Sequence, residues 1–263
     1  MKRLLACAAA LALLGGLAQA QDAQGPFPRA ASDVRGKAAG ASGPQGESWE
    51  SIKQLPDWGG VWQGSIGGGR RQRPDPPDLT PEYAAKLAAY NDAKKRGENL
   101  QTAHANCMPF AFPSSMGIYP FEFLFTPGKV TVAIETDSQM RRIFTDGRKL
   151  PDDPDASFQG YSVGHWEGDT LVVKTRGLVP SPQMEIMEGV GHSDKLVIDE
   201  SIRLVGPDSL EIKWTYNDPI VLAKPWTQTR VFQRHRDWDI QEYNCSQNNH
   251  DSADDKGRPS MHF

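Results

Sequence analysis

The sequence predicts an all-β protein in which a mainly antiparallel sheet closes, or nearly closes, into a barrel with one accessory helix. The clearest sign is residues 160–177, GYSVGHWEGDTLVVKTRG, where two alternating apolar and polar runs meet at Glu167-Gly168-Asp169. Such a pattern is typical of a β-hairpin. Similar paired runs recur from about Lys129 to Tyr243, separated by short turns. The regular alternation of strands and helices that a parallel sheet requires is not seen in the sequence.

The first 20 residues have the order of a secretory signal peptide. A basic start is followed by an apolar run from Leu4 to Leu17 and by small residues before a cleavage site near Ala20. We therefore expect the protein in the periplasm or secreted. The alternative of a lipoprotein anchored at Cys7 fits less well, because almost no apolar segment precedes that cysteine. Residues 21–54 are rich in Ala, Gly, Ser and Pro, which predicts a disordered leader.

Charge and hydropathy exclude two classes of partner. The formal net charge of −4 comes without a basic patch of the kind that binds nucleic acid, so no nucleic-acid partner is expected. No segment after the signal peptide approaches the roughly 18 apolar residues of a spanning helix, so no stable membrane insertion is expected. A small molecule is the predicted partner, and nothing in the sequence indicates an oligomeric state.

Two cysteines remain once the signal peptide is removed. Cys107 and Cys245 are an even pair in an oxidising compartment, which predicts one disulfide near the two ends of the folded region. Closing so long a loop stabilises the fold by on the order of 4 kcal/mol. A reactive thiol or a zinc thiolate is less favoured, because neither cysteine lies in a CxxC spacing.

The folded part is predicted to be a single β-barrel domain over residues 55–245, followed by a polar tail over 246–263. Near its start, Gly60-Val61-Trp62 resembles the glycine-x-tryptophan opening of lipocalin and calycin barrels, in which the tryptophan closes one barrel end. A tryptophan that simply packs in the core is the alternative.

One clear helix is predicted over residues 81–96. Thr80 suits the N-cap, Pro81 suits the first helical position, and Gly97 ends the pattern. An aromatic and Pro-rich stretch follows Cys107 and is either a lid over a pocket or an irregular core layer. The predicted strands are Phe121–Thr126, Lys129–Thr136, Gln139–Thr145, Gly160–Trp166, Thr170–Gly177, Lys195–Val205, Ser209–Asn217, Trp226–Arg236 and Trp238–Tyr243.

Six segments, taken in order, resemble a large family of secreted bacterial proteins of unassigned reaction. They are CMPFAFPSSM, RRIFTDGR, the block over residues 160–177, GHSDKLVIDESIR, NDP and KPW. The resemblance covers about Asp57 to Cys245, and WEGDTLVV is its most specific element. It implies export and a shared fold, and it supplies no mechanism. This chain has Tyr161 where His is common in that family, and His165 where Arg is common.

Charged residues on apolar strand faces are the first candidates for chemistry. By the strand period of two, Glu200 shares a face with Ile198 and Ile202, and Arg142 shares a face with Met140. Both charges are therefore predicted to point inward. A buried charge is costly unless it is paired, so the two readings are a structural Glu200–Arg142 ion pair and an acid/base group with its anion clamp.

Histidine is the side chain best matched to proton transfer near neutral pH. His192, in a Gly-flanked loop, and His165, on a strand, are both candidates, and each is alternatively an ordinary hydrogen-bonding residue. Ser162 lies in a G-x-S-x-G match. The nucleophile elbow needs a strand followed by a helix, whereas here a strand continues, so a serine nucleophile is not favoured. The spacing of histidines predicts no metal site, and no cofactor is predicted.

Two functions follow from these residues. The first is a cofactor-independent lyase, isomerase or hydratase acting on a small aromatic or hydrophobic compound inside the barrel. The second is a non-catalytic, lipocalin-like binding protein for a small hydrophobic ligand, and a third, an envelope interaction protein, would need a broad exposed apolar patch. We favour the enzyme on the sequence, because ionisable groups lie on otherwise apolar faces. Its predicted proton-transfer groups are His192, His165 and Glu200, and its predicted substrate-binding groups are Arg142, Tyr161 and Trp214.

Overall fold

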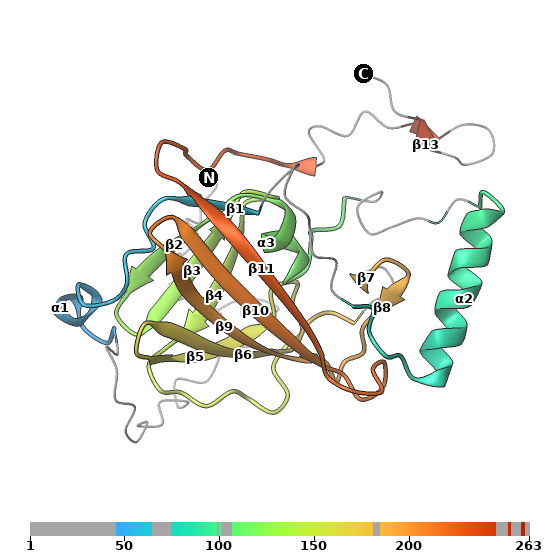
Figure 1. Ribbon diagram of the computed structural model, residues 1–263, viewed down its shortest axis with the longest axis horizontal. Helices are drawn as coiled ribbons and strands as arrows, with labels where there is room; N and C mark the ends of the chain where they lie inside the picture. Colours follow the sequence, from blue (N-terminus) through green and yellow to red (C-terminus); the bar gives the residue numbers. More distant parts are fainter. Residues whose placement is uncertain are drawn as a thin grey trace, which may run out of the picture. The chain divides into compact units, whose positions relative to one another are not determined.

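The computed structural model describes residues 46–64, 75–98, 100, 107–180, 185–245, 252–253 and 259–260. Within these residues, nine strands form a closed barrel in the order β1-β11-β10-β9-β6-β5-β4-β3-β2 (Figure 1). The predicted all-β barrel is confirmed. Its strands are β1 (Val61–Gly64), β2 (Phe121–Thr126), β3 (Lys129–Ile134), β4 (Gln139–Phe144), β5 (Tyr161–Glu167), β6 (Thr170–Arg176), β9 (Val197–Gly206), β10 (Ser209–Asn217) and β11 (Trp226–His235).

All neighbouring strands of the barrel run antiparallel except β4 and β5. That pair is parallel and short, with Ile143 opposite Ser162 and Phe144 opposite Val163. A parallel pair cannot be joined by a tight turn, so the chain needs a longer connection, here residues 145–160. The predicted hairpin at Glu167-Gly168-Asp169 is confirmed as the β5–β6 pair, with Glu167 opposite Thr170.

Buried and exposed residues alternate along the strands, as the strand period of two requires. On β10, for example, the even-numbered residues from Leu210 to Tyr216 are buried and the intervening ones are not. The predicted ranges of β2 and β10 agree with the structure. The predicted strand Trp238–Tyr243 is wrong: in this part of the described chain only Tyr243 forms a bridge, to Thr136. The segment Trp238–Tyr243 therefore does not add a strand to the barrel.

Three helices accompany the barrel in the described residues. α2 (Pro81–Lys95) is the predicted helix, with Thr80 at its N-cap. α1 (Trp49–Ile52) lies within residues expected to be a disordered leader, and its N-cap Ser48 exchanges hydrogen bonds with Ser51 in a capping box. α3 (Ser114–Ile118) was not expected as a helix. Two further short pairs are β7 (Glu185–Met187) with β8 (Val190–Gly191), and β12 (Ser252–Ala253) with β13 (Pro259–Ser260).

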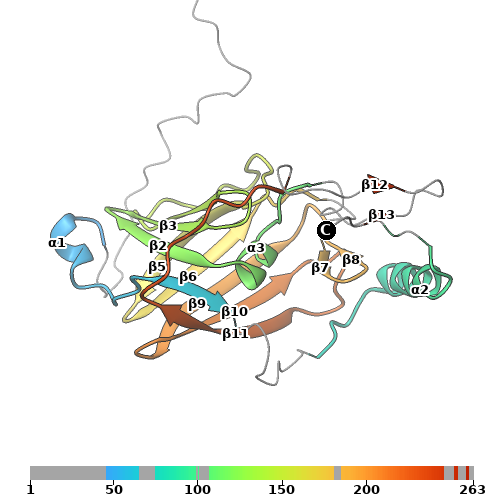
Figure 2. The same cartoon turned by 90° about the horizontal axis from the view of Figure 1, so that it is seen from above.

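Contacts with neighbouring strands fix the positions of α2 and α3. α3 packs against β1 (Figure 2), and its Gly117 carbonyl accepts a hydrogen bond from Arg230 on β11. Its Ser115 and Met116 are fully buried. α2 packs against the β7–β8 hairpin, where a Cβ on Gly189 would meet the ring of Tyr90 at 2.5 Å. Of the aromatic stretch after Cys107, Phe112, Phe121 and Phe123 are buried in the core, and Pro113 lies in the wall of a cavity.

Trp62 belongs to the barrel core. It is fully buried on β1, and its indole nitrogen donates a hydrogen bond to the carbonyl of Trp58. The guanidinium carbon of Arg234 lies 4.6 Å from the centroid of the Trp62 ring, and Arg234 also pairs with Asp57. The tryptophan of the Gly60-Val61-Trp62 segment therefore packs in the core.

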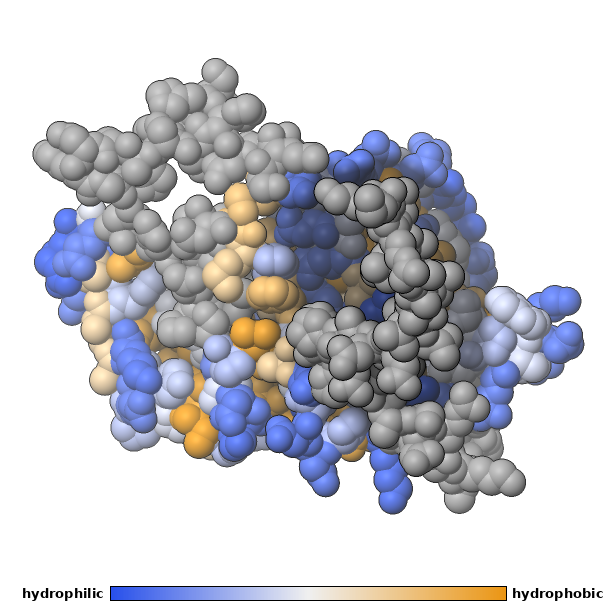
Figure 3. All heavy atoms as spheres, turned by 180° about the vertical axis from the view of Figure 1, so that it is seen from behind, coloured by the Kyte–Doolittle hydropathy of each residue, from blue (hydrophilic) through white to orange (hydrophobic). Residues whose placement is uncertain are grey.

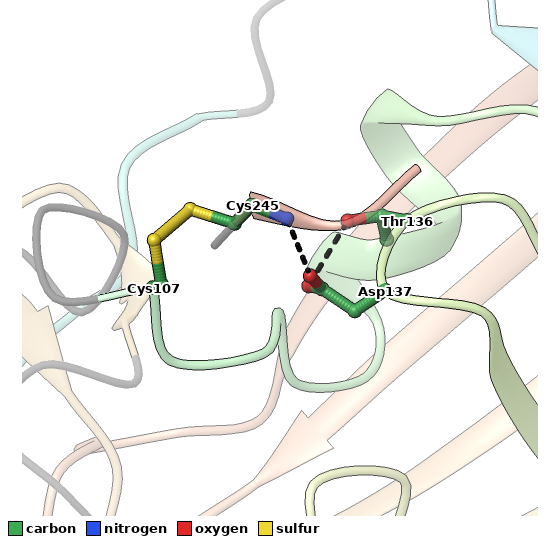
Figure 4. Close-up of a disulfide and its surroundings, with 4 residues drawn as sticks. All are labelled: Cys107, Thr136, Asp137 and Cys245. Carbon is green, nitrogen blue, oxygen red and sulfur yellow. Dashed lines mark hydrogen bonds between the residues drawn. A yellow bond between two sulfur atoms is a disulfide. The ribbon is translucent and has the colours of Figure 1, made fainter. Parts of the chain in front are cut away.

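The predicted disulfide is present between Cys107 and Cys245, which are 138 residues apart in the chain. Figure 4 shows it beside the turn between β3 and β4. There the carboxylate of Asp137 accepts hydrogen bonds from the backbone of Cys245 and the hydroxyl of Thr136. The bridge ties the segment before α3 to the end of the folded chain.

The described surface mixes residue types. Figure 3 shows hydrophobic residues interspersed among hydrophilic ones across the middle of one face, which is ordinary for folded proteins. Among the described helices, none has the length and apolar character needed to cross a bilayer. The expected signal peptide, the Cys7 alternative and most of the polar tail lie outside the described residues.

Candidate functional site

A charged pair occupies the middle of the barrel. The side chains of Arg141 and Glu200 are both fully buried and meet through two hydrogen bonds, Nη2 to Oε2 at 2.6 Å and Nη1 to Oε1 at 3.3 Å. Arg141 comes from β4 and Glu200 from β9, which are separated in the sheet by β5 and β6. The pair therefore crosses the barrel interior. Such bidentate geometry is the strongest form of arginine–carboxylate contact.

Further side chains satisfy the same pair. The Arg141 guanidinium donates to the hydroxyls of Ser162 and Thr175, and its carbon lies 3.7 Å from the centroid of the Phe112 ring. Glu200 accepts a hydrogen bond of 3.0 Å from the indole nitrogen of Trp214. The two charges neutralise each other, and both groups are hydrogen-bonded away from solvent. This cluster therefore has a structural role, because it links β4 to β9.

The expected partner of Glu200 was wrong by one residue. Arg142, predicted to point inward, is exposed, and Met140 on the same face is also exposed. Arg141 and Ile143 occupy the inner face instead. Two adjacent arginines necessarily lie on opposite faces of a strand, and either face of β4 carries apolar neighbours. Glu200 is buried and paired with an arginine, but that arginine is Arg141 and not Arg142.

A cavity of about 530 Å³ lies next to this cluster. Its floor is the inner face of β10 and β11, where Trp214 lies opposite Gln228 and Tyr216 lies opposite Trp226. The rings of Tyr216 and Trp226 have centroids 5.1 Å apart. The other walls come from Pro76 and Pro77, from Pro113 and Ser114 at the start of α3, and from Ile186 and Met187 on β7.

Besides Ser114, the polar residues that line this mainly apolar space are Tyr216, Gln228 and Arg230. Tyr216 and Gln228 are buried, and among the described residues neither side chain forms a hydrogen bond. Arg230, two residues beyond Gln228 on the same face of β11, lines the cavity and donates from Nη1 to the carbonyl of Gly117 at 2.8 Å. Burial raises the pKa of the Tyr216 hydroxyl, an effect that the Arg230 charge opposes and the Glu200 charge reinforces. The hydroxyl therefore stays protonated at neutral pH and can donate.

His192 is buried in the loop between β8 and β9. Its Nδ1 lies 2.9 Å from the carbonyl of Ser193, and its Nε2 has no hydrogen-bond partner among the described residues. Burial lowers the pKa of His192, while the Ser193 carbonyl and the charge of Asp218 act in the opposite direction. His192 neither lines the cavity nor hydrogen-bonds to Glu200.

The other two predicted site residues lie on the outside of the barrel. His165 is exposed on β5 and contacts the Glu167 carboxylate at 2.9 Å. Tyr161 accepts a hydrogen bond from Arg148 and shares with Arg142 a shallow outer groove of about 450 Å³ along β4 and β5. The structure thus brings Arg142 and Tyr161 together, but away from Glu200, and it leaves the two histidines apart from both sites.

Two other expectations concern nucleophiles and metals. Ser162 lies within β5, fully buried, with its hydroxyl 2.8 Å from that of Thr175, so the G-x-S-x-G match is part of a strand as its context indicated. In the described parts of the chain, no group of three or more His, Cys, Asp or Glu side chains is placed to hold a metal ion. Ser162 is therefore not placed on a nucleophile elbow.

Sequence reasoning found Trp214 and Glu200 but missed Tyr216, Gln228 and Arg230 as site residues. Their only sequence signal is alternation. Gln228 and Arg230 share a face with Trp226 and Phe232 on a strand with few other apolar positions. Comparison of the chain with protein-family models, with curated proteins and with solved structures finds no match.

Proposed function

We propose that this protein binds a small, largely hydrophobic compound with an aromatic part in the cavity at β10 and β11. The observation that carries this proposal is a cavity with an aromatic wall, Trp214, Tyr216 and Trp226, that Pro76, Pro77, Ile186 and Met187 also line. Small-molecule sites have this composition, and their volumes are roughly 300–1,000 Å³. A cavity of about 530 Å³ is of suitable size.

The geometry supports binding better than acid/base catalysis. Glu200 is engaged by Arg141 and Trp214, so it has no position from which to move a proton in the cavity. A general base must come within hydrogen-bonding reach of the proton that it removes. Neither His165 nor His192 lines the cavity. The enzyme and the binding protein that the sequence predicts would differ in these contacts. The contacts favour a binding protein.

A fluorescent aromatic amine, N-phenyl-1-naphthylamine, provides a direct test. We expect it to bind one site with a Kd in the micromolar range, as measured by calorimetry. Met187→Trp places a large ring in the cavity wall and should weaken binding at least tenfold, because the ring occupies the space of the ligand. Met140→Trp is the matched control, since Met140 is exposed on the outer face of β4.

The control also distinguishes binding in the cavity at β10 and β11 from binding in the outer groove along β4 and β5. Loss of binding in Met140→Trp with full binding in Met187→Trp would assign the ligand to the outer groove and overturn the proposal. Binding unaffected by either substitution would do the same. A natural ligand can be sought by mass spectrometry of protein purified from its native host under mild conditions, and an aromatic or hydrophobic compound is expected.

A further inference from the structure

The outer groove lies where β4 and β5 begin to pair. Only two residues of each strand are in register there, near the end of β4 and the start of β5. Before this contact the two segments are not paired, and residues 139–142 and 157–161 contribute most of the lining of the groove, which has a volume of about 450 Å³. The outer groove and the cavity at β10 and β11 have no lining residue in common. The groove is therefore a second, separate space on the barrel.

One wall of the outer groove is aromatic and is held in place by a charged pair. Phe144 and Tyr161 line the groove, with ring centroids 5.3 Å apart. The guanidinium carbon of Arg148 lies 3.8 Å from the centroid of the Phe144 ring, and Nη1 of Arg148 donates to the Tyr161 hydroxyl at 3.3 Å. Two further hydrogen bonds, from Nε and Nη2, join Arg148 to the Asp146 carboxylate. The wall is therefore pre-organised, which lowers the cost of binding a ligand against it.

Of the described residues that line the outer groove, Arg142 is the only charged one. Within the described residues it forms no ion pair, hydrogen bond or ring contact. The carboxylate beside the aromatic wall, Asp146, is paired with Arg148 and does not compensate the charge of Arg142. Arg142 is exposed, so water and salt screen its field, but its guanidinium is accessible to an anion in the groove.

Two uncharged donors accompany Arg142. The Tyr161 hydroxyl accepts the hydrogen bond from Arg148, so its own hydrogen is left for another acceptor. Gln139 also lines the groove. Its Oε1 accepts a hydrogen bond from Gln159, and its buried Nε2 has no partner among the described residues. Since the described lining contains no carboxylate, it favours a ligand with acceptor oxygens and a negative charge.

From this lining we propose that the outer groove is a second binding site, for a planar aromatic compound with one carboxylate. The ring packs between Met140 on β4 and Phe158 on the other side of the groove, against the wall of Phe144 and Tyr161. The carboxylate pairs with Arg142, whose planar fork matches its two oxygens. A single cation suits a monoanion better than a doubly charged phosphate ester. This site goes beyond the proposed function and does not depend on it.

An NMR titration of the isotopically labelled wild-type protein tests this proposal with 2-naphthoate and its neutral isostere 2-naphthamide. At pH 7.5 and low salt, 2-naphthoate should bind about three- to fivefold more tightly, which is the effect expected of an exposed cation. Its advantage should shrink in about 0.5 M NaCl because salt screens such a charge. The backbone amides that shift should lie in residues 139–144 and 157–161, and the indole N–H signal of Trp226 should not move.

Arg142→Met removes the cation without removing a side-chain contact of the described fold, so its urea midpoint should equal that of the wild type. It should abolish the advantage of 2-naphthoate and leave the affinity for 2-naphthamide within about twofold. Arg142→Lys keeps the charge and should retain part of the advantage. Arg203→Met is the matched control, because Arg203 is an exposed arginine of β9 outside the groove, and it should retain the full advantage.

Three results would each overturn the second site. They are equal affinity for the two compounds in the wild type, an advantage of 2-naphthoate that persists in Arg142→Met, and amide shifts that lie outside the two groove segments.

Met187→Trp separates this site from the proposed function. It fills the cavity, so it should weaken the neutral N-phenyl-1-naphthylamine and leave 2-naphthoate unchanged. If Met187→Trp weakens 2-naphthoate as well, that compound lies in the cavity and the second site is wrong. If 2-naphthoate depends on Arg142 as expected while N-phenyl-1-naphthylamine does not bind, the second site stands and only the proposed function is wrong.

Discussion

At the scale of single residues, the buried Arg141–Glu200 pair is expected to have a large effect on stability. Both side chains are fully buried, so removal of one partner leaves an uncompensated charge in the barrel. Glu200→Gln or Arg141→Met should each lower the free energy of unfolding by about 3–5 kcal/mol. The double variant Arg141→Met with Glu200→Gln should cost less than the two single losses combined. Urea unfolding followed by tryptophan fluorescence measures both quantities.

A surface pair in the same barrel is the control for this prediction. Arg203 and Glu211 are joined at 2.8 Å across β9 and β10, with the Arg203 side chain 54% exposed. Glu211→Gln should change the free energy of unfolding by less than about 1 kcal/mol. A buried-pair variant as mild as this control would contradict the structural role of Arg141 and Glu200.

His192 makes the stability of the fold depend on pH. Its pKa is lowered from the ordinary 6.5 because burial disfavours the charged ring. Below about pH 6.5 the unfolded chain binds a proton that the folded chain resists, so the free energy of unfolding falls as the pH falls. The loss levels off below the pKa of the folded protein. Above pH 6.5 the ring is neutral in both states and His192 adds no pH dependence.

The measurement compares chemical unfolding at pH 7.5 and pH 5.5. His192→Phe should remove part of the acid-induced loss of stability that the wild-type protein shows in this window. His165→Gln changes an exposed histidine of the same barrel and should leave that loss in place. An identical pH dependence in the wild type and His192→Phe would show that His192 does not titrate differently in the folded and unfolded protein.

At the scale of elements, β5 depends on a glycine in its middle. A Cβ added to Gly164 would lie 2.9 Å from the carbonyl oxygen of Val172 and 3.1 Å from Ile143. Because the nearest atom belongs to the backbone of β6, the two strands must separate to accept it. Gly164→Ala should therefore lower the free energy of unfolding by about 1–3 kcal/mol.

The control for β5 is a glycine at the end of another strand. A Cβ on Gly206, at the end of β9, meets its nearest neighbour, Ser209, at 3.6 Å, which is an ordinary contact. Gly206→Ala should stay within about 0.5 kcal/mol of the wild type in urea unfolding. If both alanine variants are equally stable, close packing of β5 against β6 is not the reason for a glycine at position 164.

β4 shows that alternation alone does not determine which face of a strand points inward. The alternation of its residues predicts two faces, and both Arg141 and Arg142 have apolar residues beside them. Only the partners inside the barrel, Ser162, Thr175 and Glu200, determine that Arg141 is the inner residue. If the other face of the strand pointed inward, every side chain would lie on the opposite side of the sheet, as happens after a one-residue shift of register.

At the scale of the whole molecule, the disulfide joins segments 138 residues apart. Replacing both Cys107 and Cys245 with serine frees the unfolded chain and should lower the free energy of unfolding by about 4 kcal/mol. Neither cysteine lines the cavity, so binding of the neutral aromatic probe should change little below the new unfolding transition. Reduction of the wild-type protein should reproduce the result, and an unchanged urea midpoint would contradict it.

The sequence by itself determined the local features of this protein. Alternation and turn residues located the β5–β6 hairpin and most strands, Thr80 and Pro81 located the start of α2, and the two remaining cysteines predicted their disulfide. These features depend on residues close in the chain or on a single possible pairing, so composition and spacing are sufficient to find them.

Only the tertiary structure decided what the barrel interior contains. Closure of the sheet turned Arg141 toward Glu200, placed the unexpected α3 between the strands, and gathered Tyr216, Gln228 and Arg230 around one cavity. These outcomes depend on which strands become neighbours and how a loop fills the remaining space. A period of two residues states that side chains alternate, but the fold of the whole chain determines which face is inside.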